Sequence, residues 1–98
     1  MSADLIWLAR AEKHLESIFE YISVDSPGAA EAYVETIVEA CAQLRTFPSS
    51  GRRYNDRFRV LVVRNHLVIY RNDDGGKRVI IAAIIDGRRD VAAVLAGD

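Results

Sequence analysis

Six arginines in the second half of this chain have the type and spacing that suggest chemistry. A guanidinium group holds carboxylate or phosphate oxygens through paired N–H donors, so arginines gathered on one surface are typical of a site for an anion or an acidic protein segment. A solvated surface with weak ion pairs to nearby aspartates is the alternative interpretation. The candidates are Arg52, Arg53, Arg59, Arg71, Arg88 and Arg89.

Groups that transfer protons near neutral pH are scarce. The two histidines are His14, within a helical pattern, and His66, in a predicted turn. No histidine or tyrosine follows Tyr70, so the end of the last predicted strand offers carboxylates such as Asp86 but no acid that works at neutral pH. We therefore predict no catalytic residue, although recruitment of Tyr54 or Tyr70 by a nuclease site stays open.

Metal and cofactor sites are not indicated either. Cys41 is the only cysteine, so no internal disulfide can form, and with two separated histidines it makes no ligand set for a metal. The glycine pair Gly75-Gly76 lacks the Lys-Ser/Thr and the helix of a phosphate-binding loop. We expect no metal and no cofactor.

Length, hydropathy and charge limit the class of protein. Ninety-eight residues, half of them hydrophobic, predict one domain over residues 1–98 with a real core. Without an 18-residue apolar run or a signal peptide, a cytoplasmic location is expected. Residues 1–50 carry three basic and eight acidic side chains, a net charge of −5, whereas residues 51–98 carry ten and six, a net charge of +4. This division favours a macromolecular partner over general coating of nucleic acid.

The first half of the chain predicts a strand and two helices. Residues 5–8 form a short apolar run with the only tryptophan, and Ala9–Ser23 has apolar residues at helical spacing. Ser26 and Pro27 suit the cap and first turn of a second helix that runs to about Arg45. The short link makes these helices an antiparallel hairpin.

The second half predicts three strands at residues 57–63, 67–71 and 79–85, with turns at residues 64–66 and 72–76 and a possible short helical tail. The fold class is therefore α+β, in the order β-α-α-β-β-β, with an antiparallel sheet packed on the helix hairpin. Arg59 and Arg71 are expected on the sheet face away from the helices. Arg88 and Arg89 follow the last strand at the rim of the sheet.

Five short motifs, in order and over nearly the whole chain, resemble the RelE/ParE superfamily of type II toxin–antitoxin toxins, and its ParE branch most closely. Members often have a histidine before the final Gly-Arg-Arg-Asp, where this chain has Asp86. The motifs are Ala11-x3-Leu15-x2-Ile18-x2-Tyr21-Ile22; Ser26-Pro27 with Ala29-Ala30; Leu44-x2-Phe47-Pro48-x2-Gly51-Arg52; Ile69-Tyr70-Arg71; and Gly87-Arg88-Arg89-Asp90.

The resemblance implies a toxin that inhibits DNA gyrase by binding and is neutralised in a heteromeric complex when the C-terminal segment of a ParD-type antitoxin folds onto it. Within it, Arg59 and Arg71 are candidates for holding the acidic antitoxin, and Arg88 and Arg89 for contact with the target. An apolar groove between the hairpin and the sheet rim is expected to accept an amphipathic helix. Ribosome-dependent mRNA cleavage of the RelE type, or an inactive partner-binding module, are the alternatives.

Overall fold

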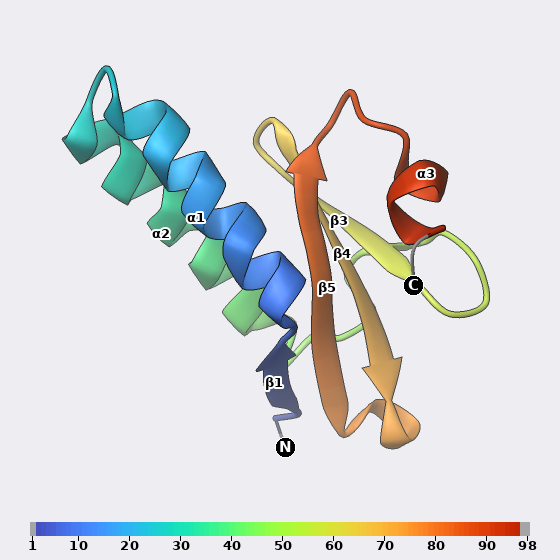
Figure 1. Ribbon diagram of the computed structural model, residues 1–98. Coiled ribbons are helices and arrows are strands. Elements are labelled where there is room, and N and C mark those ends of the chain that lie inside the picture. Colours follow the sequence, from blue (N-terminus) through green and yellow to red (C-terminus); the bar gives the residue numbers. More distant parts are fainter. Residues whose placement is uncertain (1, 97–98) are drawn as a thin grey trace.

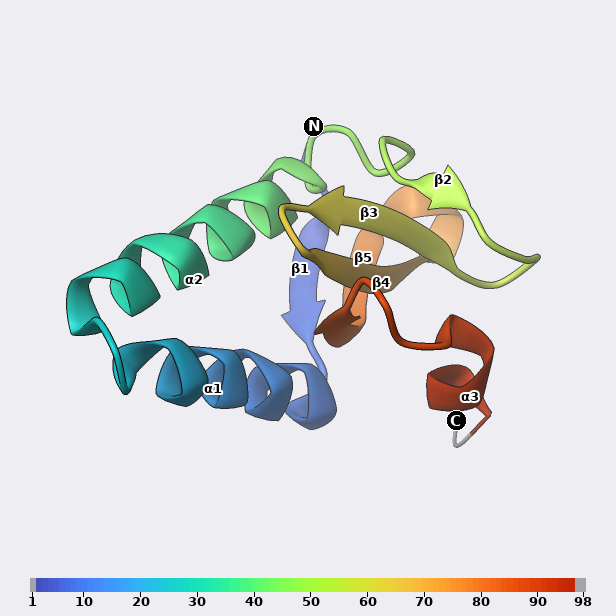
Figure 2. The same ribbon diagram turned by 90° about the horizontal axis from the view of Figure 1, so that it is seen from above.

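The computed structural model describes residues 2–96, in which two long helices pack against one face of a five-stranded sheet (Figure 1). A short third helix lies on the opposite side of the sheet (Figure 2). The helices are α1 Ala9–Ser23, α2 Pro27–Gln43 and α3 Val91–Leu95, with a 3-10 turn at Asp74–Gly76; the strands are β1 Asp4–Trp7, β2 Arg52–Arg53, β3 Arg59–Val63, β4 His66–Asp73 and β5 Arg78–Asp86.

Capping side chains define where two of the helices begin. The hydroxyl of Ser26 accepts a hydrogen bond from the backbone N–H of Ala29 at 3.2 Å, and Pro27 occupies the first turn of α2. The carboxylate of Asp90 accepts from the backbone N–H of Ala92 at 3.0 Å and begins α3. The predicted hairpin of two helices and the short helical tail are confirmed.

The order of the strands across the sheet is β1-β5-β4-β3-β2. The neighbours from β2 to β5 pair antiparallel, as predicted, but β1 pairs parallel with β5, from Asp4 opposite Arg78 to Trp7 opposite Ile81. The α+β class is confirmed, and the sheet is mixed where a purely antiparallel one was expected. The reason is that β1 and β5 are not consecutive in the chain: two helices and three strands lie between them, so no short turn forces these two strands to pair antiparallel.

Some boundaries differ from the predictions. Arg52 and Arg53, expected in a basic loop, form the short edge strand β2. The connection between β3 and β4 is only Arg64 and Asn65, because His66 already pairs with Val63. Strand pairing extends β4 to Asp73, beyond the predicted residues 67–71.

The sheet separates two apolar cores. Between the helices and the sheet lies a cluster that includes Ile37, Cys41, Leu44, Tyr70 and Ile81, all fully buried. Between α3 and the other face lies a second cluster, which includes Phe58, Val60 and Ile69 and packs against Val91, Val94 and Leu95. Burial on both faces explains why the sequence of β5 is a continuous apolar run.

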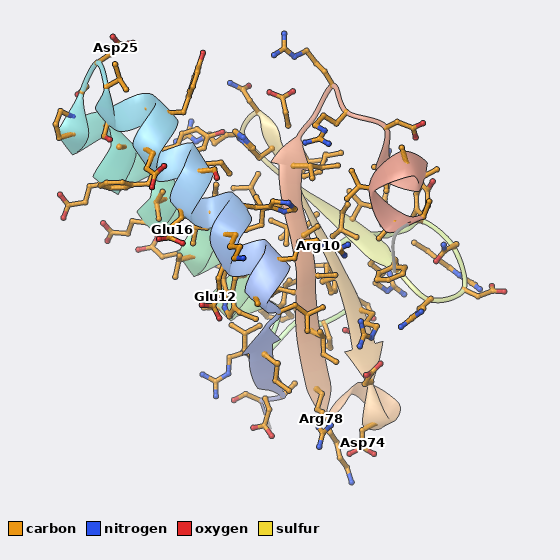
Figure 3. All side chains as sticks on the ribbon, in the orientation of Figure 1. Arg10, Glu12, Glu16, Asp25, Asp74 and Arg78 are labelled. Atoms are coloured by element: carbon orange, nitrogen blue, oxygen red, sulfur yellow. The ribbon has the colours of Figure 1, made fainter. Side chains whose placement is uncertain are left out.

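Side chains of α1 cover the part of β5 that extends beyond β1. Ala82 has no partner in the register between β4 and β5, and its carbonyl oxygen accepts from Nε of Arg10 at 3.1 Å. Figure 3 shows Arg10 on α1, beside β5. The backbone N–H of Ile84 donates to Nδ1 of His14 at 3.1 Å. His14 therefore satisfies a backbone group that would otherwise lie on an open sheet edge.

Candidate functional site

One end of the sheet brings together three segments that are far apart in the sequence. The backbone N–H of Gly87, just after β5, donates to the carbonyl oxygen of Asn65 in the β3–β4 turn at 2.8 Å. A Cβ atom at Gly87 would lie 3.2 Å from that oxygen, so glycine permits the close approach. The hydroxyl of Tyr33, on α2, reaches the same turn and accepts from the backbone N–H of Asn65 at 3.3 Å.

Tyr33 and His66 form a hydrogen-bonded pair at this end. Oη of Tyr33 lies 2.6 Å from Nδ1 of His66, and the two rings meet edge to face with centroids 5.4 Å apart. Because the Tyr33 oxygen already accepts from Asn65, we expect its O–H to donate to Nδ1, which places the proton of neutral His66 on Nε2. Burial lowers the pKa of His66, whereas the carboxylate of Asp86 acts in the opposite direction.

Asp86 and Arg88 form an ion pair beside that imidazole. Nε of Arg88 lies 3.1 Å from Oδ1 of Asp86, and the same oxygen accepts the backbone N–H of Arg88 at 2.9 Å. These bonds from Arg88 hold the pKa of Asp86 below its usual range. The Arg88 side chain is 91% exposed, so its guanidinium group can contact a partner while it keeps this orientation.

Two adjoining hollows share these residues. The first, which we call the tip pocket, has a volume of about 610 Å³, and the second, the hairpin groove, about 550 Å³. The hairpin groove confirms the predicted groove between the helix hairpin and the sheet rim. The tip pocket is lined by Val62, Arg64, Asn65, His66, Leu67, Asp86, Gly87 and Arg88; the hairpin groove is lined by Ser17, Ile18, Tyr21, Ile22, Tyr33, Asn65, His66, Asp86 and Arg88.

The six predicted arginines do not form one cluster. Arg88 lines both hollows. Arg89 lies near His14, whose pKa is lowered first by burial, then by the charge of Arg10 and then by that of Arg89. Arg52 and Arg53 lie exposed on β2, at the far edge of the sheet, where Arg53 forms an ion pair with Asp56.

Arg59 and Arg71 lie on opposite faces of the sheet. Arg71 is on the face away from the helices, as predicted, with its Nε 3.5 Å from Oδ1 of Asp73. The prediction for Arg59 is wrong, because it pairs directly with Tyr70, whose ring belongs to the helix-side core. Its Nη1 donates to the carbonyl oxygens of Gly51 at 2.8 Å and Ser49 at 3.3 Å, so Arg59 fastens the loop before β2.

Sequence reasoning missed Tyr33 and Arg64. Tyr33 falls on the apolar side of the helical pattern of α2, and only the fold shows that its hydroxyl reaches His66. Arg64 has φ of 56°, a conformation that glycine or asparagine usually adopts, in a two-residue hairpin connection. The signal in the sequence that could have identified Arg64 was an arginine in a tight turn, where glycine or asparagine is usual.

Within residues 2–96, no three His, Cys, Asp or Glu side chains gather closely enough to hold a metal ion. In the same part of the chain, no helix has the length and apolar character needed to cross a membrane. The two hollows present the Arg88 guanidinium group, the Asp86 carboxylate, the His66 imidazole and apolar groove walls, a combination that suits the binding of another macromolecule.

The family model for the ParE toxin of the type II toxin–antitoxin system parDE matches residues 5–91. This chain belongs to the ParE toxin family. It is the toxin component of a type II toxin–antitoxin system, and the predicted superfamily is confirmed. None of the curated proteins matches the chain.

Solved structures of toxins share the fold of this ParE family member. A chain of the chromosomal ParDE system from P. aeruginosa is 23% identical with a TM-score of 0.74, covering 87% of this chain and 96% of its own. A chain of the RelBE2 toxin–antitoxin complex from Mycobacterium tuberculosis is 18% identical with a TM-score of 0.63, covering 88% and 99%. A mutant of the E. coli toxin RelE in the free state is 14% identical with a TM-score of 0.68, covering 98% and 93%.

Proposed function

We propose that this ParE family toxin inhibits DNA gyrase by binding and is neutralised by a ParD-type antitoxin. The observation that carries the proposal is the exposed guanidinium group of Arg88, held by Asp86 at the rim of the hairpin groove. It offers an oriented cation beside an apolar groove, and no bond needs to be made or broken for such a site to work.

The hairpin groove is our candidate for the antitoxin. Its walls come from α1 and α2 and include the apolar side chains of Ile18 and Ile22, with Tyr21 83% exposed beside them. An amphipathic helix that is disordered in isolation buries its apolar face there, and its acidic residues meet Arg88. The apolar contact offsets the conformational entropy that the segment loses on ordering.

A supercoiling and cleavage assay with purified gyrase tests the target. The double variant Arg88→Ala/Arg89→Ala should raise the concentration of toxin needed for inhibition by about tenfold or more, because truncation of an arginine at the centre of a protein interface commonly weakens binding by at least this factor. Lys77→Ala/Arg78→Ala is the matched control, because it removes the same charge at the opposite end of β5, where Figure 3 shows Arg78. Equal losses from both double variants would show that net charge, and not this rim, governs inhibition.

Cleavage of mRNA on the ribosome is the second candidate function, and one observation favours it. His66 and Asp86 meet Arg64 and Arg88 around the tip pocket, and Tyr33 is hydrogen-bonded to His66 from the hairpin groove. Groups able to transfer protons therefore do converge with cations, contrary to the scarcity expected from the sequence. In this structure, however, Nδ1 of His66 is hydrogen-bonded to Tyr33, and the carboxylate of Asp86 is hydrogen-bonded to Arg88. Either group would have to leave its partner before it could transfer a proton to or from RNA.

A ribosome-dependent mRNA cleavage assay separates the two functions. The proposal is supported if the wild type inhibits gyrase and cleaves no mRNA, and if the His66→Asn variant inhibits gyrase equally well. Cleaved mRNA with unaffected gyrase, and loss of cleavage in His66→Asn, would establish the second function in its place.

A further inference from the structure

Two arginines border the tip pocket from different segments of the chain. Arg64 comes from the turn between β3 and β4, and Arg88 follows β5. Within residues 2–96 the side chain of Arg64 forms no hydrogen bond and no ion pair, so no carboxylate in this part of the chain offsets its charge. A guanidinium group in this setting is a set of donors for an oxyanion.

Arg88 keeps donors for a ligand although its side chain is bonded to Asp86. Nε of Arg88 donates to Oδ1 of Asp86 at 3.1 Å, and Nη2 donates to Oδ2 at 3.4 Å. These two bonds use only part of the N–H groups of the guanidinium group, and the others remain for a second anion. Arg64, Arg88 and Asp86 are the lining residues with a fixed charge, so the tip pocket has a net charge of +1 while His66 is neutral.

His66 supplies a third donor. Oη of Tyr33 lies 2.6 Å from Nδ1, and in the tautomer expected for neutral His66 the proton is on Nε2. Within residues 2–96 Nε2 forms no hydrogen bond, and the ring lines the tip pocket as well as the hairpin groove. The imidazole can therefore donate an N–H to a ligand in the tip pocket even while it is uncharged.

Donors from three positions around one hollow favour a tetrahedral anion. Arg64 lies in the turn, His66 is the first residue of β4, and Arg88 lies beyond the end of β5. The two oxygens of a carboxylate lie in one plane, whereas the oxygens of a phosphate point in several directions and can accept from all three side chains at once. The volume of about 610 Å³ is within the range of pockets for small ligands and exceeds what a bare phosphate ion fills.

We propose that the tip pocket binds a small phosphate ligand, inorganic phosphate or a phosphate monoester, through Arg64, His66 and Arg88. Asp86 does not contact the ligand in this site but orients Arg88, through the side-chain bonds given above and the backbone N–H of Arg88 at 2.9 Å. Binding of phosphate to the free protein requires neither gyrase nor an antitoxin, so it stands apart from the proposed function.

The imidazole makes this binding depend on pH. Protonation of His66 raises the net charge of the tip pocket from +1 to +2, which strengthens the attraction for an anion. Asp86 lies opposite His66 in the pairing of β4 with β5 and favours the charged imidazole, whereas burial disfavours it. Asp86 itself stays ionised in mild acid, because its bonds to Arg88 lower its pKa. The titratable and charged residues that share the two hollows with His66 are Tyr21 of α1, Tyr33 of α2, Arg64, Asp86 and Arg88.

The test is an NMR titration of the ¹⁵N-labelled full-length protein at pH 8 and constant ionic strength, with inorganic phosphate and, separately, with ribose 5-phosphate. We expect saturable shifts of the amide signals of Arg64, Gly87 and Arg88. Arg64→Gln should weaken binding about tenfold, because a charged donor is lost. Arg78→Gln is the matched control, since it removes the same charge at the opposite end of β5, and it should bind within about twofold of the wild type.

Sulfate tests the role of His66, because this tetrahedral anion keeps its charge between pH 5 and pH 8. The wild type should bind sulfate about fivefold more tightly at pH 5 than at pH 8, since one positive charge is added beside the anion. The ratio should fall below about twofold in His66→Asn, which lacks a group in the position of Nε2. It should persist in His14→Gln, which removes the other histidine of the chain.

Three results would overturn the proposal. They are the absence of saturable shifts with either phosphate ligand, equal binding by Arg64→Gln and Arg78→Gln, and binding of duplex DNA without binding of the two small ligands. A sulfate ratio unchanged in His66→Asn would overturn the part of His66. Tighter binding of ribose 5-phosphate would identify a monoester as the ligand, and tighter binding of inorganic phosphate would identify the free ion, so either order supports the site. Arg64 is exposed, so its replacement leaves the core intact and the comparison with Arg78→Gln decides.

Discussion

The hydroxyl of Tyr70, at the centre of the sheet, accepts the backbone N–H of Gly51 at 2.9 Å and donates to the carbonyl oxygen of Pro48 at 2.8 Å. Asn72 adds a second donor to the Pro48 oxygen, at 3.1 Å. These bonds tie the loop between α2 and β2 to β4. They give a physical reason why the motif with Phe47-Pro48 and Gly51-Arg52 occurs together with the separate motif that contains Tyr70.

Tyr70→Phe should lower the free energy of unfolding by about 1–3 kcal/mol, because the Gly51 N–H loses its partner in a buried setting. Tyr70 itself is fully buried. Tyr54→Phe is the matched control, since Tyr54 is 41% exposed, and it should change stability by less than about 0.5 kcal/mol. Urea denaturation measures both, and equal effects would contradict the role of the Tyr70 hydroxyl.

Gly51→Ala should destabilise the protein by about 1–3 kcal/mol through overpacking. A Cβ atom at Gly51 would lie 2.8 Å from the Tyr70 ring and hydroxyl and 2.9 Å from the carbonyl oxygen of Val60. Gly28→Ala, in the first turn of α2, meets nothing within 4 Å and should stabilise by about 0.4–1 kcal/mol. Thermal denaturation of the two variants should therefore shift in opposite directions, and a shared direction would refute the steric argument.

His14 should make stability depend on pH. Burial first, then the charges of Arg10 and Arg89, lower its pKa from 6.5 in the fold, where Nδ1 must stay unprotonated to accept from Ile84. The stabilisation is complete above pH 6.5, and it declines as the pH falls from 6.5 toward the lower pKa of the folded state, because the unfolded chain binds the proton more readily.

Urea denaturation at pH 8 and at pH 5.5 checks the contribution of His14. His14→Gln keeps an acceptor for Ile84 but cannot titrate, so it should lose less stability than the wild type over this interval. The pKa of His66 is also lowered, so His66 makes stability fall as the pH falls in the wild type and in His14→Gln alike. The difference between the two proteins therefore reports His14. An unchanged pH dependence in His14→Gln would rule out the mechanism.

The Tyr33–His66 pair predicts a single tautomer of His66. Tyr33 accepts from Asn65 and is therefore expected to donate to Nδ1, so neutral His66 should carry its proton on Nε2. Long-range ¹H–¹⁵N spectra at pH 8 report this directly. Tyr33→Phe should give a mixture of the two tautomers, and a mixture already present in the wild type would be inconsistent with the geometry.

Cys41 should be inert in the folded protein. The side chain is fully buried, and burial raises the pKa of its thiol to about 12, so the reactive thiolate is almost absent at neutral pH. Iodoacetamide at pH 8 should leave the native protein unmodified and alkylate it rapidly in denaturing urea. Rapid modification without urea would show that Cys41 is accessible.

Local patterns in the sequence were enough to predict both long helices, four of the five strands and the motifs of the family. Helical spacing predicted the bounds of α1 correctly, the Ser26-Pro27 pair predicted the start of α2, and the apolar run predicted a strand at β5 buried on both faces. These features are local, since each depends on the periodicity or capping of a few neighbouring residues.

Which side chains meet became clear from the three-dimensional fold alone. The parallel pairing of β1, the face of Arg59 and the contact between Tyr33 and His66 all depend on how segments distant in sequence pair and pack. A shift of register by one residue sends each side chain to the other face of a sheet, so composition and spacing could not place these groups. The loop before β2 illustrates the difference, because its motif is visible in the sequence but its partner, the Tyr70 hydroxyl, is visible only in the fold.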